Sequence, residues 1–359
     1  MIDVIVVPDF SSWDVPVFTA RTLFFLGSWL EHPGKSRNWP LHVACVGDPP
    51  PCVRELAAQC GASLTVHPNP NTPKNIFLNK FMGFKIRPKT KSFFLIDVDI
   101  LINGDLSPLA EMGPCISALP NSHNLVPMEI WETLYAHFGV PLSEDRILCL
   151  RGQYSEKLRK DFLRHNELEP MPPYFNGGVL LAPWESGLHT LWEQYTRNAY
   201  ESFAELGGDW RFVANEDQAT LAVAIAKKRQ DGVSFVTTPP EFHGNYVFYW
   251  SGVLNYADTR LFHAIELFRC GDREKPLDVI KEVDLYEAHL LRGVYTKNLG
   301  GRVTQVLHKL SGADGSPVAI EIKKLVRRIK LIVERYVAPG MEKDGINSFE
   351  RRTDWRDHV

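Results

Sequence analysis

The sequence lacks the features that mark several protein classes. Its six cysteines include no Cys-x-x-Cys pair and are too sparse for a disulfide scaffold, so we expect reduced thiols. No apolar run approaches the roughly 20 residues needed to cross a bilayer. The formal net charge is −3, so the chain has no overall positive field of the kind that attracts nucleic acid. We therefore expect no nucleic-acid partner.

The N-terminus shows no sign of a targeting leader. The chain begins with MIDVIVV, which predicts a strand from the first residues rather than a charged segment followed by an apolar one. The sequence also contains no internal repeat and no low-complexity segment. We therefore expect a cytoplasmic protein with a conventional core.

An alternation of strand and helix patterns fills the first 110 residues. Apolar strands of this kind are buried on both faces, which is typical of a parallel sheet covered by helices. The pattern predicts an α/β fold that contains a β-α-β-α-β, Rossmann-like unit. The expected strands are Val4–Val7, His42–Val46, Leu64–His67 and Phe93–Ile96, and the expected helices are Val15–Leu30, Pro51–Gln59 and Asn75–Phe84.

The remaining chain predicts a mixed region followed by a helical extension. We expect a main domain over residues 1–277 and a helical C-terminal extension over 278–359. Within the extension, residues 317–337 place an apolar stripe opposite lysines and arginines, which is typical of a basic amphipathic helix. This helix would pack on the main domain, associate with a second copy or a partner helix, or contact an anionic membrane peripherally. Further helices are expected at Val126–Phe138, Leu188–Phe203 and 215–228, and strands at Tyr174–Pro183 and Val233–Thr237.

The strongest functional signal is a pair of aspartates that interrupts a buried apolar run. The segment FFLIDVDILINGDLSPL places Asp97 and Asp99 directly after Phe93–Ile96. Strand alternation would put both carboxylates on one side, where they repel each other unless a cation lies between them. Open α/β sheets bind ligands at this edge, and carboxylates suit Mg²⁺ and Mn²⁺. The segment therefore predicts a divalent-metal site that bridges a diphosphate, with a solvated turn as the alternative.

Four segments, in order, resemble glycosyltransferases of the GT-A fold, most closely glycosyltransferase family 8, the family of glycogenin and bacterial galactosyltransferases. With the first strand they extend over about three-quarters of the chain. The resemblance implies a GT-A fold, a mostly parallel central sheet flanked by helices, and metal-dependent transfer of a sugar from a nucleoside diphosphate sugar, UDP favoured, to an acceptor hydroxyl. The segments are the Asp97–Asp99 segment, YFNGGVLL at Tyr174–Leu181, Glu216–Gln218 and Phe262–His263.

The resemblance also implies a first set of residues that would bind the metal and the donor. Asp99 and His263 would ligate the metal directly, while Asp97 would assist the metal or contact the ribose. A histidine ligand favours Mn²⁺ over Mg²⁺. Lys80 would contact the donor sugar. The alternatives are a core or surface histidine at His263 and a solvated helix lysine at Lys80.

The resemblance implies a second set of residues that would act at the place where the sugar is transferred. Asn176 would hold donor hydroxyls or face the acceptor, and Gly177 and Gly178 would let the backbone approach the sugar. Asp217 and Gln218 would lie beside the anomeric carbon, with Gln218 stabilising a cation-like transition state. Alternatively, Asp217 is a first-turn carboxylate that serves only its helix.

Weaker patterns add two donor-binding positions. Asp9, in the loop after the first strand, would accept a hydrogen bond from a base N–H. The family's late phosphate-binding lysine has no counterpart at the usual spacing, so Arg269 would take its place, since a guanidinium suits a diphosphate, or an insertion would bring Lys275 there. The aromatic segment 242–250 predicts either an acceptor platform or part of the core.

The sequence leaves alternatives both for the stereochemistry of sugar transfer and for the class of function. The resemblance favours retention, but Glu216-Asp217 also resembles the acidic pair of inverting GT-A enzymes, in which Asp217 would be the general base. A nucleotidyltransferase would carry a glycine-rich, basic loop after the first strand, and Pro8–Trp13 has neither feature. The last alternative is a non-catalytic sugar-nucleotide-binding relative. The acceptor would be a saccharide, a glycolipid or a small molecule.

Overall fold

The computed structural model describes most of the first 263 residues. The described residues are 1–11, 15–32, 34–69, 76–121, 123–124, 126–151, 168–208, 210, 213, 217–242 and 259–263. The predicted extension with its amphipathic helix lies outside them. Arg269, Lys275, Glu216 and the aromatic segment from residue 243 to 250 also lie outside, so the predictions for these positions stay predictions.

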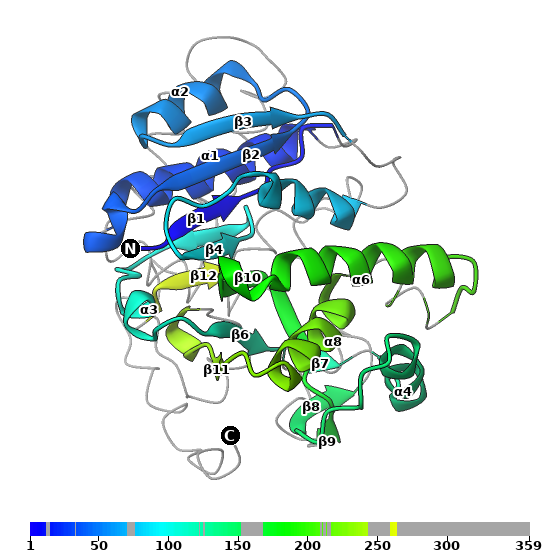
Figure 1. Ribbon diagram of the computed structural model, residues 1–359. Helices are drawn as coiled ribbons and strands as arrows, with labels where there is room; N and C mark the ends of the chain where they lie inside the picture. The colour runs from blue at the N-terminus through cyan, green and yellow to red at the C-terminus, as the bar shows by residue number, and fades with distance from the viewer. Residues whose placement is uncertain are drawn as a thin grey trace, which may run out of the picture. The chain divides into compact units, whose positions relative to one another are not determined.

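Seven strands form the main sheet, in the order β11-β6-β10-β4-β1-β2-β3. Its strands are β1 (Asp3–Val6), β2 (Leu41–Val46), β3 (Ser63–His67), β4 (Ser92–Ile96), β6 (Ile116–Pro120), β10 (Phe175–Pro183) and β11 (Phe235–Thr237). The pairs β1–β2, β2–β3 and β6–β11 are parallel, whereas β6–β10 is antiparallel. This mostly parallel sheet flanked by helices confirms the predicted α/β fold (Figure 1).

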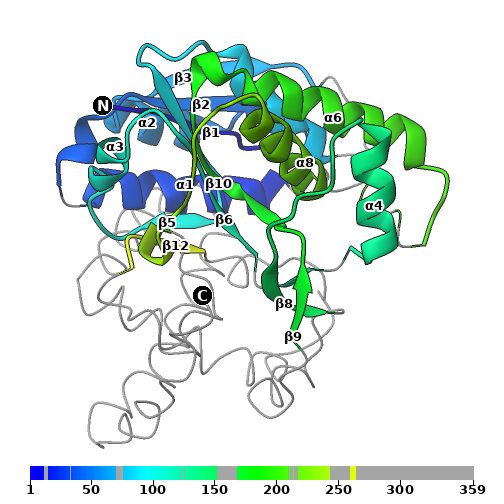
Figure 2. The same cartoon turned by 60° about the horizontal axis from the view of Figure 1, so that its bottom comes forward.

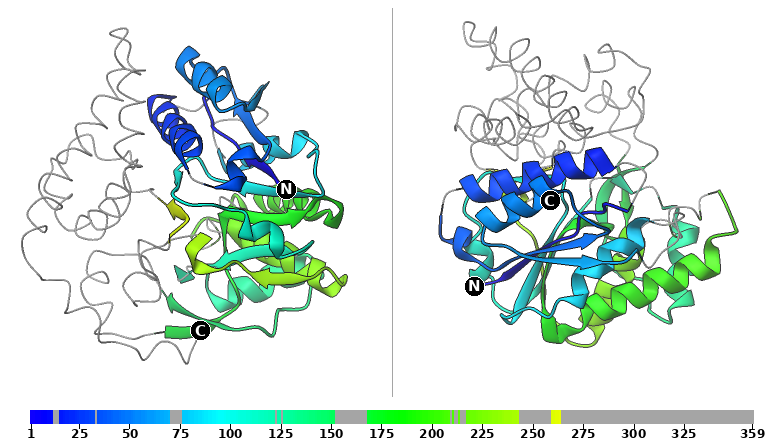
Figure 3. Two further views of the ribbon diagram at one scale, coloured as in Figure 1. Left: turned by 90° about the vertical axis from the view of Figure 1, so that its left-hand side faces the viewer. Right: turned by 90° about the horizontal axis from the view of Figure 1, so that it is seen from above.

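The chain divides into two compact units, of which the first contains residues 1–69, 96–112 and the described residues from Pro239 onward. Its parallel strands β1, β2 and β3 are covered by helices that lie side by side (Figure 3). The helical segments of this unit are α1 (Val15–Glu31), η1 (Lys35–Asn38), α2 (Pro51–Gln59), α3 (Pro108–Glu111) and η4 (Pro240–Phe242).

A short antiparallel pair completes the first unit. Strand β5 (Ile100–Ile102) pairs with β12 (Leu261–His263) (Figure 2), and His263 lies opposite Ile100 in the register. Helix α1 packs on β5, and the Ser28 hydroxyl oxygen accepts a hydrogen bond from the Ile102 N–H at 3.0 Å. These contacts fix the chain that follows β4.

The second unit contains residues 70–95 and 113–238. Helices α6 and α8 pack against each other (Figure 2). A 3-10 segment packs on α6 through aromatic rings. The Phe81 ring lies 5.0 Å from the Trp192 ring, and Phe84 lies 5.1 Å from Phe93. Besides its sheet strands, the unit holds η2 (Ile76–Lys85), α4 (Met128–His137), η3 (Trp184–Ser186), α6 (Leu188–Phe203), α8 (Asp217–Gln230), and the small sheet β7 (His123–Asn124), β8 (Ile147–Arg151) and β9 (Leu168–Met171).

One predicted helix has a different geometry. The helix expected at Asn75–Phe84 is the 3-10 helix η2 from Ile76 onward, and Asn75 lies outside the described residues. A 3-10 segment places residues three apart on the same side, and Phe81 and Phe84 both enter the aromatic core in this way. Tertiary packing therefore overrides the α-helical pattern here. The same packing fixes the position of Lys80, which precedes Phe81.

Across the described ranges, no helix combines the length and the apolar character that crossing a bilayer requires.

Candidate active site

The two aspartates of the Asp-Val-Asp segment lie in a tight turn. Strand β4 ends at Ile96, and the Ile100 N–H donates to the Asp97 carbonyl at 3.2 Å, which closes a four-residue turn before β5. The prediction that strand alternation aligns the two carboxylates is therefore wrong. The alternative of a turn is correct, but the turn is only partly solvated: Val98 is 6% and Asp99 7% exposed, whereas Asp97 is half-buried.

A cation from helix α1 lies near this turn. Arg21 Nη1 is 3.9 Å from Asp99 Oδ2, and the Arg21 guanidinium carbon lies 5.5 Å from the centroid of the Phe18 ring. A positive charge at this distance offsets part of the carboxylate's charge in a site that is largely removed from water. Arg21 was not predicted from the sequence, because nothing in the pattern of α1 indicates which distant residue its side chain contacts.

The strand pairing brings the backbone of His263 beside the aspartate turn. His263 lies opposite Ile100, the residue after Asp99. Among the side chains that the structure describes, which do not include that of His263, no cluster of three or more His, Cys, Asp or Glu could hold a metal. The carboxylates of Asp97 and Asp99 supply the oxygen ligands that Mg²⁺ and Mn²⁺ prefer, and His263 would add a nitrogen. The donor set therefore fits the predicted metal.

Asp9 lies in the loop after β1 and is 4% exposed. Its Oδ1 accepts hydrogen bonds from the Ser11 N–H at 2.9 Å and the Ser11 hydroxyl at 2.7 Å. The loop runs close to Gly47, where a Cβ would lie 2.8 Å from the Ser11 nitrogen and φ is +79°. Asp9 therefore lies at the carboxyl edge of parallel strands, the edge where such sheets bind ligands.

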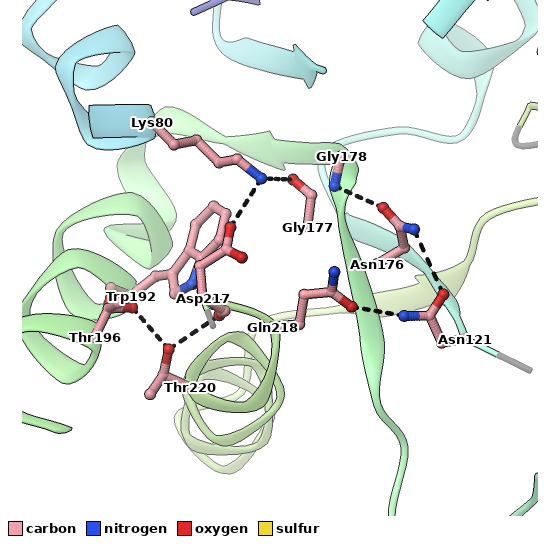
Figure 4. A network of polar contacts seen from close by, with 10 residues as sticks. All are labelled: Lys80, Asn121, Asn176, Gly177, Gly178, Trp192, Thr196, Asp217, Gln218 and Thr220. Atoms are coloured by element: carbon pink, nitrogen blue, oxygen red, sulfur yellow. Dashed lines mark hydrogen bonds and ion pairs between the residues drawn. The ribbon is translucent and has the colours of Figure 1, made fainter. Parts of the chain in front are cut away.

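Lys80 and Asp217 form a buried ion pair in the second unit. Lys80 Nζ lies 2.8 Å from Asp217 Oδ2, with the side chains 15% and 2% exposed. The same ammonium donates to the Gly177 carbonyl at 3.2 Å (Figure 4). Lys80 is therefore not a solvated helix lysine. Three predicted site residues, from η2, β10 and α8, meet at this point.

The first turn of α8 is held by bonds to its backbone. The Trp192 indole N–H donates to the Asp217 carbonyl at 2.7 Å, and the Thr220 hydroxyl donates to the same oxygen at 3.0 Å (Figure 4). Thr196 and Thr220 share a further hydroxyl bond at 2.7 Å. These bonds fix the place from which the Asp217 and Gln218 side chains project.

The structure explains why position 177 is a glycine, which the sequence alone did not reveal. A Cβ at this position would lie 2.8 Å from Asp217 Oδ2 and 3.4 Å from Lys80 Nζ. A real Cβ does not approach an oxygen so closely, so any larger residue would displace the ion pair. The glycine therefore makes room for the pair, whatever it also does for a sugar.

A chain of side-chain amides runs beside the ion pair. The Gly178 N–H donates to Asn176 Oδ1 at 2.7 Å, Asn176 Nδ2 donates to Asn121 Oδ1 at 3.4 Å, and Asn121 Nδ2 donates to Gln218 Oε1 at 2.6 Å (Figure 4). Asn176 and Gln218 were predicted as site residues from the sequence, whereas Asn121 was not. The only local signal was an asparagine directly after an apolar strand, β6.

Comparison with known proteins places the chain in a family. Residues 29–229 of the 359 match the family model of the Rhodobacterales glycosyltransferase domain. The chain belongs to the Rhodobacterales glycosyltransferase family. This glycosyltransferase is therefore an enzyme of sugar transfer, as the sequence predicted. The narrower resemblance to glycosyltransferase family 8 stays a prediction.

Several solved structures are distantly similar to this glycosyltransferase, and no curated protein matches it. Mouse xyloside xylosyltransferase 1 in its apo form is 13% identical with a TM-score of 0.43, over 75% of this chain and 100% of that one. The galactosyltransferase LgtC with donor and acceptor sugar analogues is 14% identical at 0.42, over 84% and 95%. GlyE of Streptococcus pneumoniae TIGR4 is 13% identical at 0.42, over 74% of this chain but only 55% of its own. Similarities this low assign no residue a role.

Proposed function

We propose that this glycosyltransferase moves a sugar from a nucleoside diphosphate sugar, UDP favoured, to a hydroxyl of a saccharide, glycolipid or small molecule. The reaction would require a divalent metal. The observation that carries the proposal is the turn after β4 that holds the half-buried Asp97 and the buried Asp99, in a chain of a glycosyltransferase family. Family membership disfavours the nucleotidyltransferase alternative, and the presence of both carboxylates disfavours a non-catalytic relative.

Asp97, Asp99 and His263 would hold the metal, with Mn²⁺ favoured over Mg²⁺. When bound, the metal would neutralise negative charge on the departing diphosphate. Arg21 would reduce the repulsion at Asp99 when no cation is present, because its guanidinium lies 3.9 Å away. Asp9 would bind the base from the loop after β1.

The Lys80–Asp217 pair would bind hydroxyls of the donor sugar, because an ammonium donates to hydroxyls and a carboxylate accepts from them. Asn176 would bind a further donor hydroxyl or the acceptor. Aligned groups of this kind hold the reacting atoms in the geometry of attack and remove part of the entropic barrier. The Gly177 and Gly178 backbone would lie against the sugar.

The transfer would proceed with retention. The acceptor oxygen forms a bond to the anomeric carbon as the bond from that carbon to the diphosphate breaks. The leaving diphosphate takes the acceptor proton on the same face, so no side-chain base is needed. Asp217 is 2% exposed and ion-paired with Lys80, which favours a binding role over that of a general base in the inverting alternative.

Donor turnover tests this proposal. The full chain is incubated with α-linked UDP-, GDP- and dTDP-sugars and Mn²⁺, and the released sugar is observed by NMR before it mutarotates. We expect hydrolysis of a UDP-sugar that first yields the α-anomer and stops when the metal is chelated. A β-anomer as first product would support the inverting alternative. Turnover unaffected by chelation would contradict the proposed requirement for a divalent metal.

Peripheral membrane contact and self-association through residues 317–337 stay proposals. Both rest on the pattern of basic and apolar residues in that segment.

A further inference from the structure

The amide chain beside the ion pair has a fixed direction. Each asparagine or glutamine side chain has one end that donates and one that accepts, and turning the amide over exchanges the two. The Gly178 N–H can only donate, so Asn176 must present Oδ1 to it, and the two atoms are 2.7 Å apart. The nitrogen of Asn176 therefore faces the next member of the chain.

This direction passes from one side chain to the next. Because Asn176 presents Nδ2, Asn121 presents Oδ1 to it at 3.4 Å and turns its own Nδ2 toward Gln218. Gln218 must then present Oε1, which accepts from Asn121 at 2.6 Å. Asn121 is itself held by its backbone, since its N–H donates to the Tyr174 carbonyl at 2.6 Å.

As a result, the carbonyl oxygen of Gln218 already accepts a hydrogen bond from Asn121. The amide nitrogen of Gln218 projects in a different direction from the oxygen bound to Asn121 (Figure 4). In the described part of the chain, no group accepts a hydrogen bond from this nitrogen. Gln218 thus presents N–H donors, and donors of this kind suit hydroxyl and phosphate oxygens, which are abundant on a nucleotide sugar.

We propose that Asn121 is a positioning residue that sets Gln218 to act on the substrate as a hydrogen-bond donor rather than through its carbonyl oxygen. The inference rests on the proposed function for the place of Gln218 near the reacting sugar. It changes the predicted role of Gln218, because a cation-like sugar is stabilised by an oxygen, and the Gln218 oxygen is engaged with Asn121.

Reversing the amide at Asn121 tests the inference. Asn121→Asp keeps the side-chain shape, still accepts from Asn176, and cannot donate to Gln218, so Gln218 must turn over and present its oxygen to the substrate. Asn121→Ala leaves Gln218 unrestrained, so the productive orientation stays accessible. Asn198→Asp is the matched control, because it makes the same chemical change at an exposed asparagine of α6, outside the amide chain.

The expected order of kcat is wild type and Asn198→Asp highest, then Asn121→Ala, then Asn121→Asp. Loss of one preorganised donor commonly costs 10²–10³ in kcat, so we expect a decrease of about tenfold or more for Asn121→Asp, with the donor KM changed less than about threefold. A merely structural asparagine would show the reverse order, because the isosteric aspartate would be tolerated better than the truncation. That reverse order, or a kcat for Asn121→Asp within about twofold of wild type, would overturn the inference.

Two further readouts separate this inference from the proposed function. NMR of ¹⁵N-glutamine-labelled protein reports the Gln218 amide, assigned by its loss in Gln218→Glu. We expect its N–H signal to move downfield in Asn121→Asp, as an N–H bound to a carboxylate does, and an unchanged signal overturns the inference even if no donor is turned over.

If Gln218→Glu leaves turnover unchanged, Gln218 does not act on substrate, and both its proposed place and the inference fail. If Gln218→Glu lowers kcat but Asn121→Asp does not, only the inference fails.

Discussion

At the scale of single residues, the Lys80–Asp217 pair has the largest energetic consequence. A buried charge is costly unless it is paired, and removing one partner leaves the other uncompensated. Asp217 is 2% exposed, and its carboxylate lies 2.8 Å from the Lys80 ammonium. The stability of the first turn of α8 therefore depends on a residue far away in the sequence.

We predict that Lys80→Met destabilises the protein by about 3–5 kcal/mol, because breaking a buried pair strands the remaining charge. Adding Asp217→Asn to Lys80→Met should recover part of this loss, since the stranded charge is removed. The measurement is the free energy of unfolding from urea denaturation.

Lys227→Met is the matched control for this prediction. Lys227 pairs with Asp231 on the surface of α8, with side chains 39% and 41% exposed. Exposed pairs contribute about 0–1 kcal/mol, so this variant should unfold almost as wild type does. A Lys80→Met variant that matched it would show that the Lys80–Asp217 pair contributes little.

At the scale of secondary-structure elements, local patterns predicted most of the helices and strands. Helices α2 and α6 begin and end where the sequence placed them, at Pro51–Gln59 and Leu188–Phe203. Both have their apolar residues on one stripe, and Pro51 starts α2 where a missing N–H costs nothing. The ring of Phe81 in η2 packs on the distant Trp192, and β5, which follows the turn at Asp97, pairs with the distant β12, so sequence patterns did not predict the geometry of these two segments.

The candidate residues also divide into those that local motifs predict and those that only the fold reveals. Lys80, Asn176, Gly177, Asp217 and Gln218 were named from short motifs, and the structure brings them together in one unit. Arg21 and Asn121 were missed because each is recognised only through its contacts with Asp99 and Gln218. A motif records residue types at fixed spacing, whereas these contacts depend on the fold.

One carboxylate, that of Asp105, joins η1 to the loop after β5. Asp105 Oδ1 accepts from the Ser36 N–H at 3.0 Å and the Ser36 hydroxyl at 2.8 Å, and Asp105 also bonds to Ser107 through both oxygens. Burial raises the pKa of Asp105, but the hydrogen bonds from Ser107 and Ser36 outweigh it and hold that pKa well below its ordinary value. The bonds thus favour the ionised carboxylate in the folded state.

We predict that Asp105→Asn removes a pH-dependent contribution to stability. A lowered pKa in the folded state adds stability that is complete above the unfolded value, about 3.9 for aspartate, and is lost as the pH falls through the folded value. The difference in unfolding free energy between wild type and Asp105→Asn should be constant between pH 5 and 7, within about 0.5 kcal/mol, and should shrink below about pH 4. Urea denaturation at each pH measures it, and a difference that stays constant down to pH 3 would contradict the prediction.

At the scale of the whole molecule, each compact unit carries one group of candidate residues. The first unit holds Asp9, Asp97 and Asp99, for which we propose binding of the nucleotide and its metal. The second holds the Lys80–Asp217 pair and the amide chain, for which we propose contacts with the sugar. The predicted boundary between residues 277 and 278 lies outside the described chain and stays a prediction.

The central claim is that the turn at Asp97 and Asp99 holds a cation that binds the diphosphate of the donor. Calorimetric titration of UDP into the full chain, with and without Mn²⁺, tests it in the wild type, in Asp99→Asn, and in Asp48→Asn as a control at an exposed carboxylate 83% accessible to solvent. We predict that Mn²⁺ strengthens UDP binding about tenfold or more, or 1.4 kcal/mol, in the wild type and in Asp48→Asn, and by less than about twofold in Asp99→Asn. Equal strengthening in all three proteins, or none in the wild type, would contradict the account.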